Sequence, residues 1–389
     1  MNAKPRIYLD NAATSWPKPE AVYAAVDHYQ REIGAPSGRS GYREAVEASR
    51  IVERARQGVA RLVGARDSRQ IVFTASGTDS LNLALFGVLQ PGDHVVTTVC
   101  DHNSVLRPLR ALSDAGVISV THVPCDGAGY VSPDDVRCAL RQDTRLAAIV
   151  HGSNVTGAIQ SVEEIGTVVR EQGVLLLVDA AQTLGHFPID VEQLQVDLLA
   201  APGHKGLLGP LGTGVLYIRP SIEMELKPLR YGGTGTFSQK DRQPETLPDK
   251  YEAGNHNVPG LAGLAAAAEF LQTRRIDSVQ AHHALLAKRL LDGLTTIPGV
   301  NIHGPDAKSP RTSVVSFTMN GYDPQELAAL LEVAGNVQCR AGLHCAPRMH
   351  EALGTLEHGG TVRLSPGWAT TEAEIDCALE LIATLAAAK

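Results

Sequence analysis

The amino-acid sequence predicts an α/β fold in which helices cover a mainly parallel β-sheet. Short apolar runs of strand length alternate with amphipathic stretches from about residue 45 to residue 220. This alternation is typical of parallel sheets, because the connection between two parallel strands is usually a helix. The expected helices and strands are helices 44–62, 81–88 and 105–115 and strands 70–74, 94–99, 118–123, 146–151, 174–179, 197–200 and 214–218.

A second, smaller α/β domain is expected after this sheet. Glycine and proline interrupt the pattern over residues 231–259, and so long an irregular segment is more often functional or interfacial than idle. The later pattern consists of helices 261–273 and 277–294, strand 314–319, helix 324–334, strand 361–365 and helix 372–387. We therefore expect three parts: an N-terminal segment, 1–20, that joins the small domain, a large domain, 21–260, and a linking helix with the small domain, 261–389.

Composition and charge restrict the class of protein. Hydrophobic residues make up 43% and charged residues 20% of the 389 residues, and the net charge is -7. Negative charge offers no basic field to nucleic acid or an anionic membrane, and no apolar run is long enough to span a bilayer. The six cysteines form no CxxC pair, and the first residues show no apolar signal core. These features predict a cytoplasmic enzyme without disulfides, a metal, a nucleic-acid partner or a membrane anchor.

Two residues at strand ends point to a bound cofactor. Asp179 ends the strand 174–179, and Lys205 follows the next strand in a glycine-flanked turn. Ligands of parallel α/β sheets bind at the carboxyl ends of the strands. Pyridoxal phosphate needs a lysine for its covalent attachment and a carboxylate for its pyridine nitrogen. The turn at 75–79 begins a helix whose free amides suit a phosphate, whereas a strand follows the glycines of 209–214 and argues against a dinucleotide loop there.

With these segments the chain resembles the class V aminotransferase family of fold-type I pyridoxal-phosphate enzymes, and within it the cysteine desulfurases and selenocysteine lyases. The resemblance runs from YLDNAAT at residues 8–14 to the last helix. It implies that Lys205 forms the Schiff base with pyridoxal phosphate and that Asp179 pairs with the pyridine nitrogen. The other implied cofactor contacts are those of Asn154 and Gln182 with the ring hydroxyl, His102 with the ring face, and Gly77, Thr78 and His204 with the phosphate.

A second motif, RAGLHC at residues 340–345, resembles the segment that carries the nucleophilic cysteine of the desulfurases. The resemblance implies that Cys345 takes the sulfur of the substrate, and a nearby cation would favour its thiolate. It also implies that Arg363 grips the substrate carboxylate, a task that suits a planar guanidinium. Further expected substrate contacts come from Arg340 and Asn154, and the stretch that ends at Arg39 is one more candidate.

A glycine-rich loop around Thr234 and Thr236 resembles the family loop that reaches the phosphate of the partner subunit. We therefore expect a homodimer in which one of these two threonines crosses over. Two features depart from the family pattern. Pro202 and Gly203 stand where many members carry a phosphate-binding serine or threonine, and Ala369 stands near the position of a common asparagine.

The sequence therefore predicts a pyridoxal-phosphate-dependent cysteine desulfurase, which converts L-cysteine to L-alanine and leaves the sulfur as a persulfide on Cys345. Its partners would be the amino-acid substrate, a second copy of the chain and a sulfur-acceptor protein. A selenocysteine lyase is an alternative, because the same scaffold could run that reaction without a protein thiol. Another class V lyase, aminotransferase or epimerase is a second alternative. A non-catalytic protein that binds pyridoxal phosphate is disfavoured by the intact set of Lys205, Cys345 and Arg363.

Overall fold

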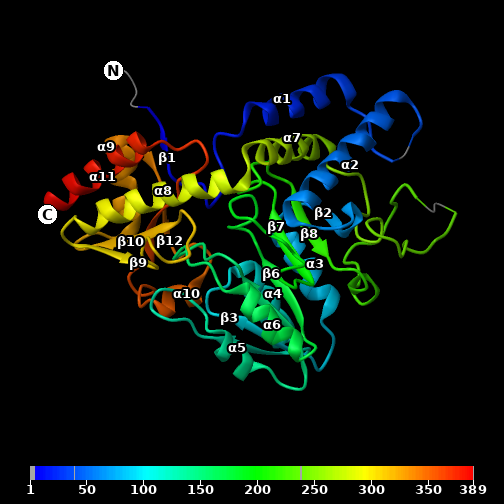
Figure 1. The fold of residues 1–389 in the computed structure, drawn as a ribbon, viewed down its shortest axis with the longest axis horizontal. Helices are drawn as coiled ribbons and strands as arrows, with labels where there is room; N and C mark the ends of the chain where they lie inside the picture. Colours follow the sequence, from blue (N-terminus) through cyan, green and yellow to red (C-terminus); the bar gives the residue numbers. More distant parts are fainter. Residues whose placement is uncertain (1–4, 39, 237–238, 389) are drawn as a thin grey trace.

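The larger part of the protein is built on a mainly parallel sheet, as predicted (Figure 1). The computed structural model describes residues 5–38, 40–236 and 239–388. Within them this sheet has seven strands in the order β2-β8-β7-β6-β5-β3-β4, and β8 alone runs antiparallel to its neighbours. The strands are β2 (Ile71–Thr74), β3 (His94–Thr98), β4 (Ser119–Val123), β5 (Thr144–Val150), β6 (Leu175–Asp179), β7 (Leu198–Pro202) and β8 (Gly214–Ile218).

Helices cover both faces of this sheet, which explains why its central strands are largely apolar on both faces. In β5, Ala147 and Ile149 enter one core, whereas Leu146 and Ala148 enter the other. The first core includes α1 (Glu20–His28), α2 (Arg43–Val63), α5 (Pro133–Ala139), α6 (Val162–Glu171) and α7 (Val258–Arg274), and the second includes α3 (Gly77–Val88) and α4 (Asn103–Asp114). Within the described ranges, no helix is both long and apolar enough to cross a membrane.

The smaller part packs around a four-stranded antiparallel sheet with the order β12-β13-β10-β9. Figure 1 shows α8 running from the first part to this one. The N-terminal strand β1 pairs in parallel with β11, and Ile7 and Leu9 enter the core of the smaller part. The domain boundaries at residues 20 and 260 stay a prediction. The elements are β1 (Ile7–Tyr8), α8 (Ile276–Thr295), β9 (Val300–His303), β10 (Val315–Met319), α9 (Pro324–Gly335), β11 (Val337–Gln338), β12 (Arg340–Gly342), α10 (Pro347–Ala352), β13 (Thr361–Leu364) and α11 (Glu372–Ala387).

Local interactions account for the differences from the predicted elements. Helix α3 begins at Gly77 and not at residue 81, because the Ser76 side chain accepts a hydrogen bond from the Asp79 amide and caps the helix. Helix α6 was not predicted, since Gly166 weakens its helical pattern. The remaining short helical turns are Tyr29–Ile33, Ser68–Gln70 and Ile222–Met224.

A buried ion pair ties α2 to the edge strand β2 and to the irregular segment that precedes α7. Nη1 and Nη2 of Arg56 each donate a hydrogen bond of 2.8 Å to one carboxylate oxygen of Glu252, and both side chains are buried. The same carboxylate accepts a hydrogen bond from the Phe73 amide at 2.6 Å and lies 2.7 Å from His256 Nε2. Because the Phe73 amide belongs to an edge strand, Glu252 also covers a donor that the sheet itself leaves unpaired.

Removal of this pair should destabilise the fold strongly. Arg56→Met leaves Glu252 buried without its cation, which should cost about 3–5 kcal/mol in the free energy of unfolding. Burial alone would raise the pKa of Glu252, but Arg56 and His256 outweigh it and lower that pKa to about 2. The stabilisation that the Glu252 carboxylate adds to the free energy of unfolding should therefore be complete above pH 4.5 and disappear as the pH falls toward 2. Urea unfolding at several pH values measures both effects. The control Arg54→Met, at an exposed ion pair, should cost less than about 1 kcal/mol, and an equal loss in both variants would contradict the account.

Candidate active site

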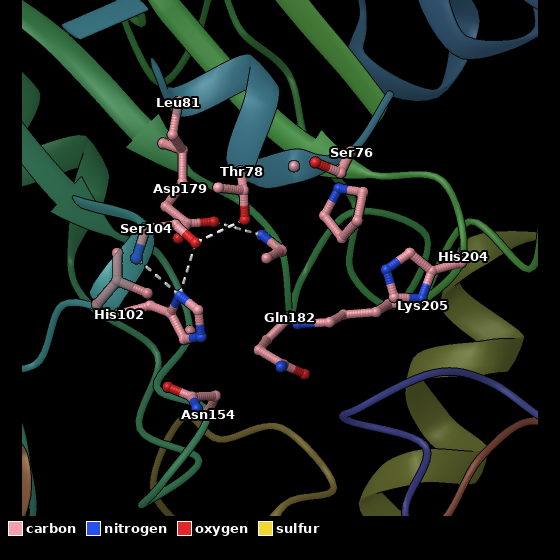
Figure 2. A pocket seen from close by; sticks show the side chains of 15 residues that line it. Ser76, Thr78, Leu81, His102, Ser104, Asn154, Asp179, Gln182, His204 and Lys205 are labelled. Atoms are coloured by element: carbon pink, nitrogen blue, oxygen red, sulfur yellow. Dashed lines mark hydrogen bonds between the residues drawn. The ribbon is translucent and has the colours of Figure 1, made fainter. Parts of the chain in front are cut away.

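A pocket opens where β5, β6 and β7 end and α3 begins (Figure 2). This is the edge of the sheet at which parallel α/β proteins bind ligands. The structure brings together here every residue predicted to hold the cofactor within one subunit, namely Gly77, Thr78, His102, Asn154, Asp179, Gln182, His204 and Lys205. They come from five separate connections, so the fold and not sequence proximity assembles them.

Lys205 extends into the middle of the pocket from the turn after β7 (Figure 2). Its burial lowers the pKa of the ammonium to about 8. The carboxylate of Asp179 opposes this shift, whereas the charges of Arg363 and Arg340 add to it. The amine therefore loses its proton far more readily than an exposed lysine, and only the neutral amine can form a covalent bond with a carbonyl compound.

Asp179 is the last residue of β6 and lies at the base of the same pocket. Its Oδ1 accepts a hydrogen bond from the Ala181 amide at 2.9 Å. Burial raises the pKa of this carboxyl, while the Ala181 amide and the charge of Lys205 oppose that rise. A buried carboxylate with so few protein partners has a strong preference for a cationic or N–H partner from a ligand.

The His102 side chain caps the N-terminus of α4 and also lines the pocket, so capping does not prevent it from facing a ligand. Its Nδ1 accepts a hydrogen bond from the Ser104 amide at 3.0 Å, which places the proton of the neutral ring on Nε2. Burial lowers the pKa of His102 to about 4, and the charge of Lys205 adds to the effect. Ser104 Oγ lies 2.9 Å from this Nδ1 and 2.8 Å from Thr78 Oγ1, and thereby connects His102 to the first turn of α3.

The first turn of α3 approaches the end of β7 so closely that only glycine fits. A Cβ on Gly77 would lie 2.9 Å from Cδ of Pro202 and 3.0 Å from its nitrogen. Pro202 has no N–H group to donate to a phosphate, but its ring packs against the turn that would hold one. The partial positive charge of the helix N-terminus and the Thr78 hydroxyl face the pocket at this point.

Several buried polar atoms of the site have no partner among the residues that the structure describes. Among them, Asn154 Oδ1 and His204 Nδ1 belong to residues of the pocket lining, and Arg363 Nε lies nearby in the strand β13. An unpaired buried polar atom costs about 1–3 kcal/mol, so such atoms indicate a polar ligand. Together with the lysine, the carboxylate and the helix N-terminus, they fit pyridoxal phosphate.

The loop that carries Cys345 is held in an unfavourable backbone conformation beside this pocket. His344 and Cys345 have φ values of 49° and 59°, a region that residues other than glycine rarely adopt. Asn154 Nδ2 donates to the His344 carbonyl at 2.6 Å, and the Asn103 amide donates to the Cys345 carbonyl at 2.7 Å. Arg340 Nη2 lies 3.4 Å from Cys345 Sγ, so the guanidinium that was expected at the substrate contacts the thiol.

Arg363 lies deep in the structure, with an exposed fraction of 1%. Its Nη2 donates to Asp10 Oδ1 at 2.8 Å and its Nη1 donates to the Asn154 carbonyl at 3.0 Å, whereas Nε is unpaired. Asp10 was not singled out from the sequence, although it stands inside the YLDNAAT motif. Ser104 was likewise missed, since a serine after a strand carries no specific signal by itself.

Two of the predicted positions lie away from the pocket, and one lies outside the described residues. Thr234 Oγ1 and Thr236 Oγ1 are 2.9 Å apart, and Thr236 Oγ1 donates to Asp249 at 3.0 Å. Neither threonine lines the pocket of its own chain. Arg39 is not among the described residues.

Comparisons with known proteins agree with this geometry. Residues 7–377 match the family model described as Aminotransferase class-V. A protein named probable cysteine desulfurase from Methanothermobacter thermautotrophicus is 36% identical, over 98% of this chain and 94% of its own length. Another, named cysteine desulfurase IscS, from Methanosarcina thermophila, is 33% identical over 97% of this chain and 91% of its own. The solved apo structure of the cysteine desulfurase from Thermococcus onnurineus NA1 has a TM-score of 0.92 at 32% identity, and covers 99% of this chain and 95% of that one. The fold expected from the sequence is confirmed.

Removal and re-addition of the cofactor should report the pKa of Lys205. Because only the neutral amine reacts, the rate of covalent uptake of pyridoxal phosphate by cofactor-free protein should rise with pH through about 8 and then level off. Asp179→Asn should move the midpoint to lower pH, since the Asp179 charge raises the pKa of Lys205. Borohydride trapping followed by mass spectrometry measures the uptake, and Lys205→Ala serves as the blank. A midpoint near the ordinary lysine value of 10.5 would contradict the predicted depression.

Proposed function

The chain belongs to the class V aminotransferase family, and we propose that it acts there as a pyridoxal-phosphate-dependent cysteine desulfurase. In this proposal L-cysteine is converted to L-alanine, and its sulfur is left as a persulfide on Cys345. The observation that carries the proposal is the contact of 3.4 Å between Arg340 Nη2 and Cys345 Sγ, in a loop tied by Asn154 to the pocket of Lys205. This contact places a hydrogen-bond donor on the sulfur that would attack the substrate.

Different residues of the pocket would bind the cofactor and transfer the α-proton of the substrate. Pyridoxal phosphate, when bound, supplies an electron sink that acidifies the Cα–H bond of the attached amino acid. Lys205 would hold the cofactor and, once the substrate replaces it, move the α-proton with Nζ, a task for which a pKa of about 8 is suited. Asp179 would face the pyridine nitrogen. His102, kept neutral by burial, would cover the ring face without adding charge.

The substrate end would be organised by three residues that already contact one another or the thiol. Arg363 would bind the carboxylate, because its buried Nε has no partner among the described residues and Asp10 holds Nη2 of the guanidinium in place. Arg340 would stabilise the Cys345 thiolate until it attacks the substrate sulfur. The Cβ–S bond of the substrate then breaks, the sulfur stays on Cys345 Sγ as the outer sulfur of a persulfide, and the electron pair left at Cβ takes up the proton that the substrate thiol gave up. Lys205 returns the α-proton to Cα, and the carbon skeleton leaves as alanine.

The proposal includes a homodimer. Thr234 and Thr236 are located in the irregular segment before α7, which extends from the body of the molecule in Figure 1. Neither threonine lines the pocket of its own chain, and in the proposal one of them exchanges its present hydrogen bonds for a contact with the phosphate end of a second copy. The cytoplasmic location and a sulfur-acceptor protein remain predictions of the same proposal.

Mass spectrometry after treatment with L-cysteine tests the sulfur transfer. We expect added sulfur on the peptide that contains Cys345, and Cys345→Ala should lose alanine formation from L-cysteine by at least about a hundredfold, because the group that takes the sulfur is missing. Cys377→Ala, at an exposed cysteine of α11, is the matched control and should behave as wild type. Alanine formation from L-cysteine that survives Cys345→Ala would contradict the persulfide step.

Assays of wild type and Cys345→Ala on both L-cysteine and L-selenocysteine separate the desulfurase from the alternatives kept above. A selenocysteine lyase would turn over L-selenocysteine with or without Cys345 and leave no sulfur on that residue. An aminotransferase would release a keto acid, and an epimerase would release the D-amino acid. Chiral chromatography of the products distinguishes these results.

A further inference from the structure

A groove beside the Cys345 loop has a lining that the reaction itself does not use. It lies between α4, β4 and α10, and we call it the basic groove. Its apolar lining includes Leu106, Val120 and Pro347, and its charged lining consists of Arg107, Arg110 and Arg348. Among the described residues that line it there is no aspartate or glutamate.

Two of the three arginines have side chains without a partner among the described residues. The guanidinium groups of Arg107 and Arg348 make no hydrogen bond or ion pair there, while that of Arg110 pairs with Asp114 at 2.7 Å. His122, which also lines the groove, adds no charge, because burial and the neighbouring Arg348 lower its pKa to about 4. The groove is therefore positive on a chain whose net charge is -7.

The basic groove opens directly beside the residue that would carry the sulfur. Asn103, the first residue of α4, lines the groove, and its amide donates to the Cys345 carbonyl at 2.7 Å. Pro347 and Arg348 follow Cys345 by two and three residues and belong to α10. Cys345 itself is partly exposed. A partner seated in the groove would have its adjoining residues next to the thiol.

We propose that the basic groove docks a carboxylate-rich segment of a thiol-bearing protein that takes the sulfur from Cys345. This inference rests on the proposed function. The chain as a whole repels an acidic partner, so a local positive site is needed to bring such a partner to this one face. The arginines would attract the acidic segment and fix its position along the groove, and the apolar lining would add buried contact area.

The transfer needs no oxidant or reductant. The acceptor thiolate attacks the outer sulfur of the Cys345 persulfide, and the bond between that sulfur and Cys345 Sγ breaks. Cys345 leaves as a thiolate, which Arg340 stabilises, and the acceptor becomes the persulfide. Atoms and charge balance, and the enzyme returns to its starting form.

Two synthetic peptides test the docking. Both carry one cysteine in the same apolar sequence, flanked by glutamates in one and by lysines in the other. After the holoenzyme has been loaded with radiolabelled L-cysteine and freed of excess substrate, the rate constant of label transfer to each peptide is measured at low and at high salt. We expect the acidic peptide to react on the order of tenfold faster at low salt, and the preference to shrink at high salt.

Charge reversal assigns the effect to the groove. Arg107→Glu combined with Arg348→Glu should abolish the preference for the acidic peptide and leave the rate of persulfide formation on Cys345 within about twofold of wild type, since neither residue contacts the reacting groups. The control combines Arg54→Glu with Arg61→Glu on α2, which changes the net charge equally but far along the chain from the groove. The control should keep the preference.

The outcomes separate this inference from the proposed function. Normal persulfide loading with an unchanged preference in the groove variant would overturn the docking alone. Absence of sulfur on wild-type Cys345 would overturn the proposed function. In that case fluorescence anisotropy of the acidic peptide, with serine in place of its cysteine, still decides the docking: binding that the groove variant loses supports it, and equal binding to both proteins overturns it.

Discussion

The burial of Arg363 is the constraint on which the site depends. A guanidinium with an exposed fraction of 1% must be neutralised and hydrogen-bonded, and here Asp10 from the N-terminal segment and the Asn154 carbonyl from the end of β5 do so. Three segments that are far apart in the sequence are thereby joined at one point. Asn154 then extends the connection, because its side chain holds the loop of Cys345 through the His344 carbonyl. The pocket of Lys205, the proposed carboxylate site at Arg363 and the proposed nucleophile Cys345 are thus joined by one set of hydrogen bonds.

The same burial explains the chemistry of the pocket. Removal from water lowers the pKa of Lys205 and of His102 and raises that of Asp179. The site therefore holds a lysine that loses its proton near pH 8, a neutral imidazole and a carboxyl with few protein partners. Unpaired atoms of Asn154 and His204 remain in the lining, and they have a use only when a polar ligand is bound. By contrast, the buried pair of Arg56 and Glu252, away from the site, is fully hydrogen-bonded.

The sequence predicted the parts of this arrangement that local patterns determine. Asp179 and Lys205 each lie where a strand ends. Because β6 and β7 are parallel neighbours, both residues reach the same edge of the sheet and line one pocket. The motif at residues 340–345 singled out both Arg340 and Cys345, but it did not state that the two side chains contact each other. Contacts between distant segments were not predictable in the same way. No local pattern states that Asp10 pairs with Arg363, that Ser104 links His102 to Thr78, or that Arg348 joins Arg107 in a groove. The crossing of Thr234 or Thr236 stays a prediction, because it concerns a second copy of the chain.

A double-mutant cycle on Asp10 and Arg363 tests the central claim most directly. The rate constant for persulfide formation on Cys345 would be measured against L-cysteine concentration for wild type, Asp10→Asn, Arg363→Gln and the double variant. If the two side chains act as one unit, each single change should weaken substrate use strongly, the double variant should be little worse than Arg363→Gln, and the coupling should be about 1.5–3 kcal/mol. Losses that simply add would contradict the account, because Asp10 and Arg363 would then contribute independently.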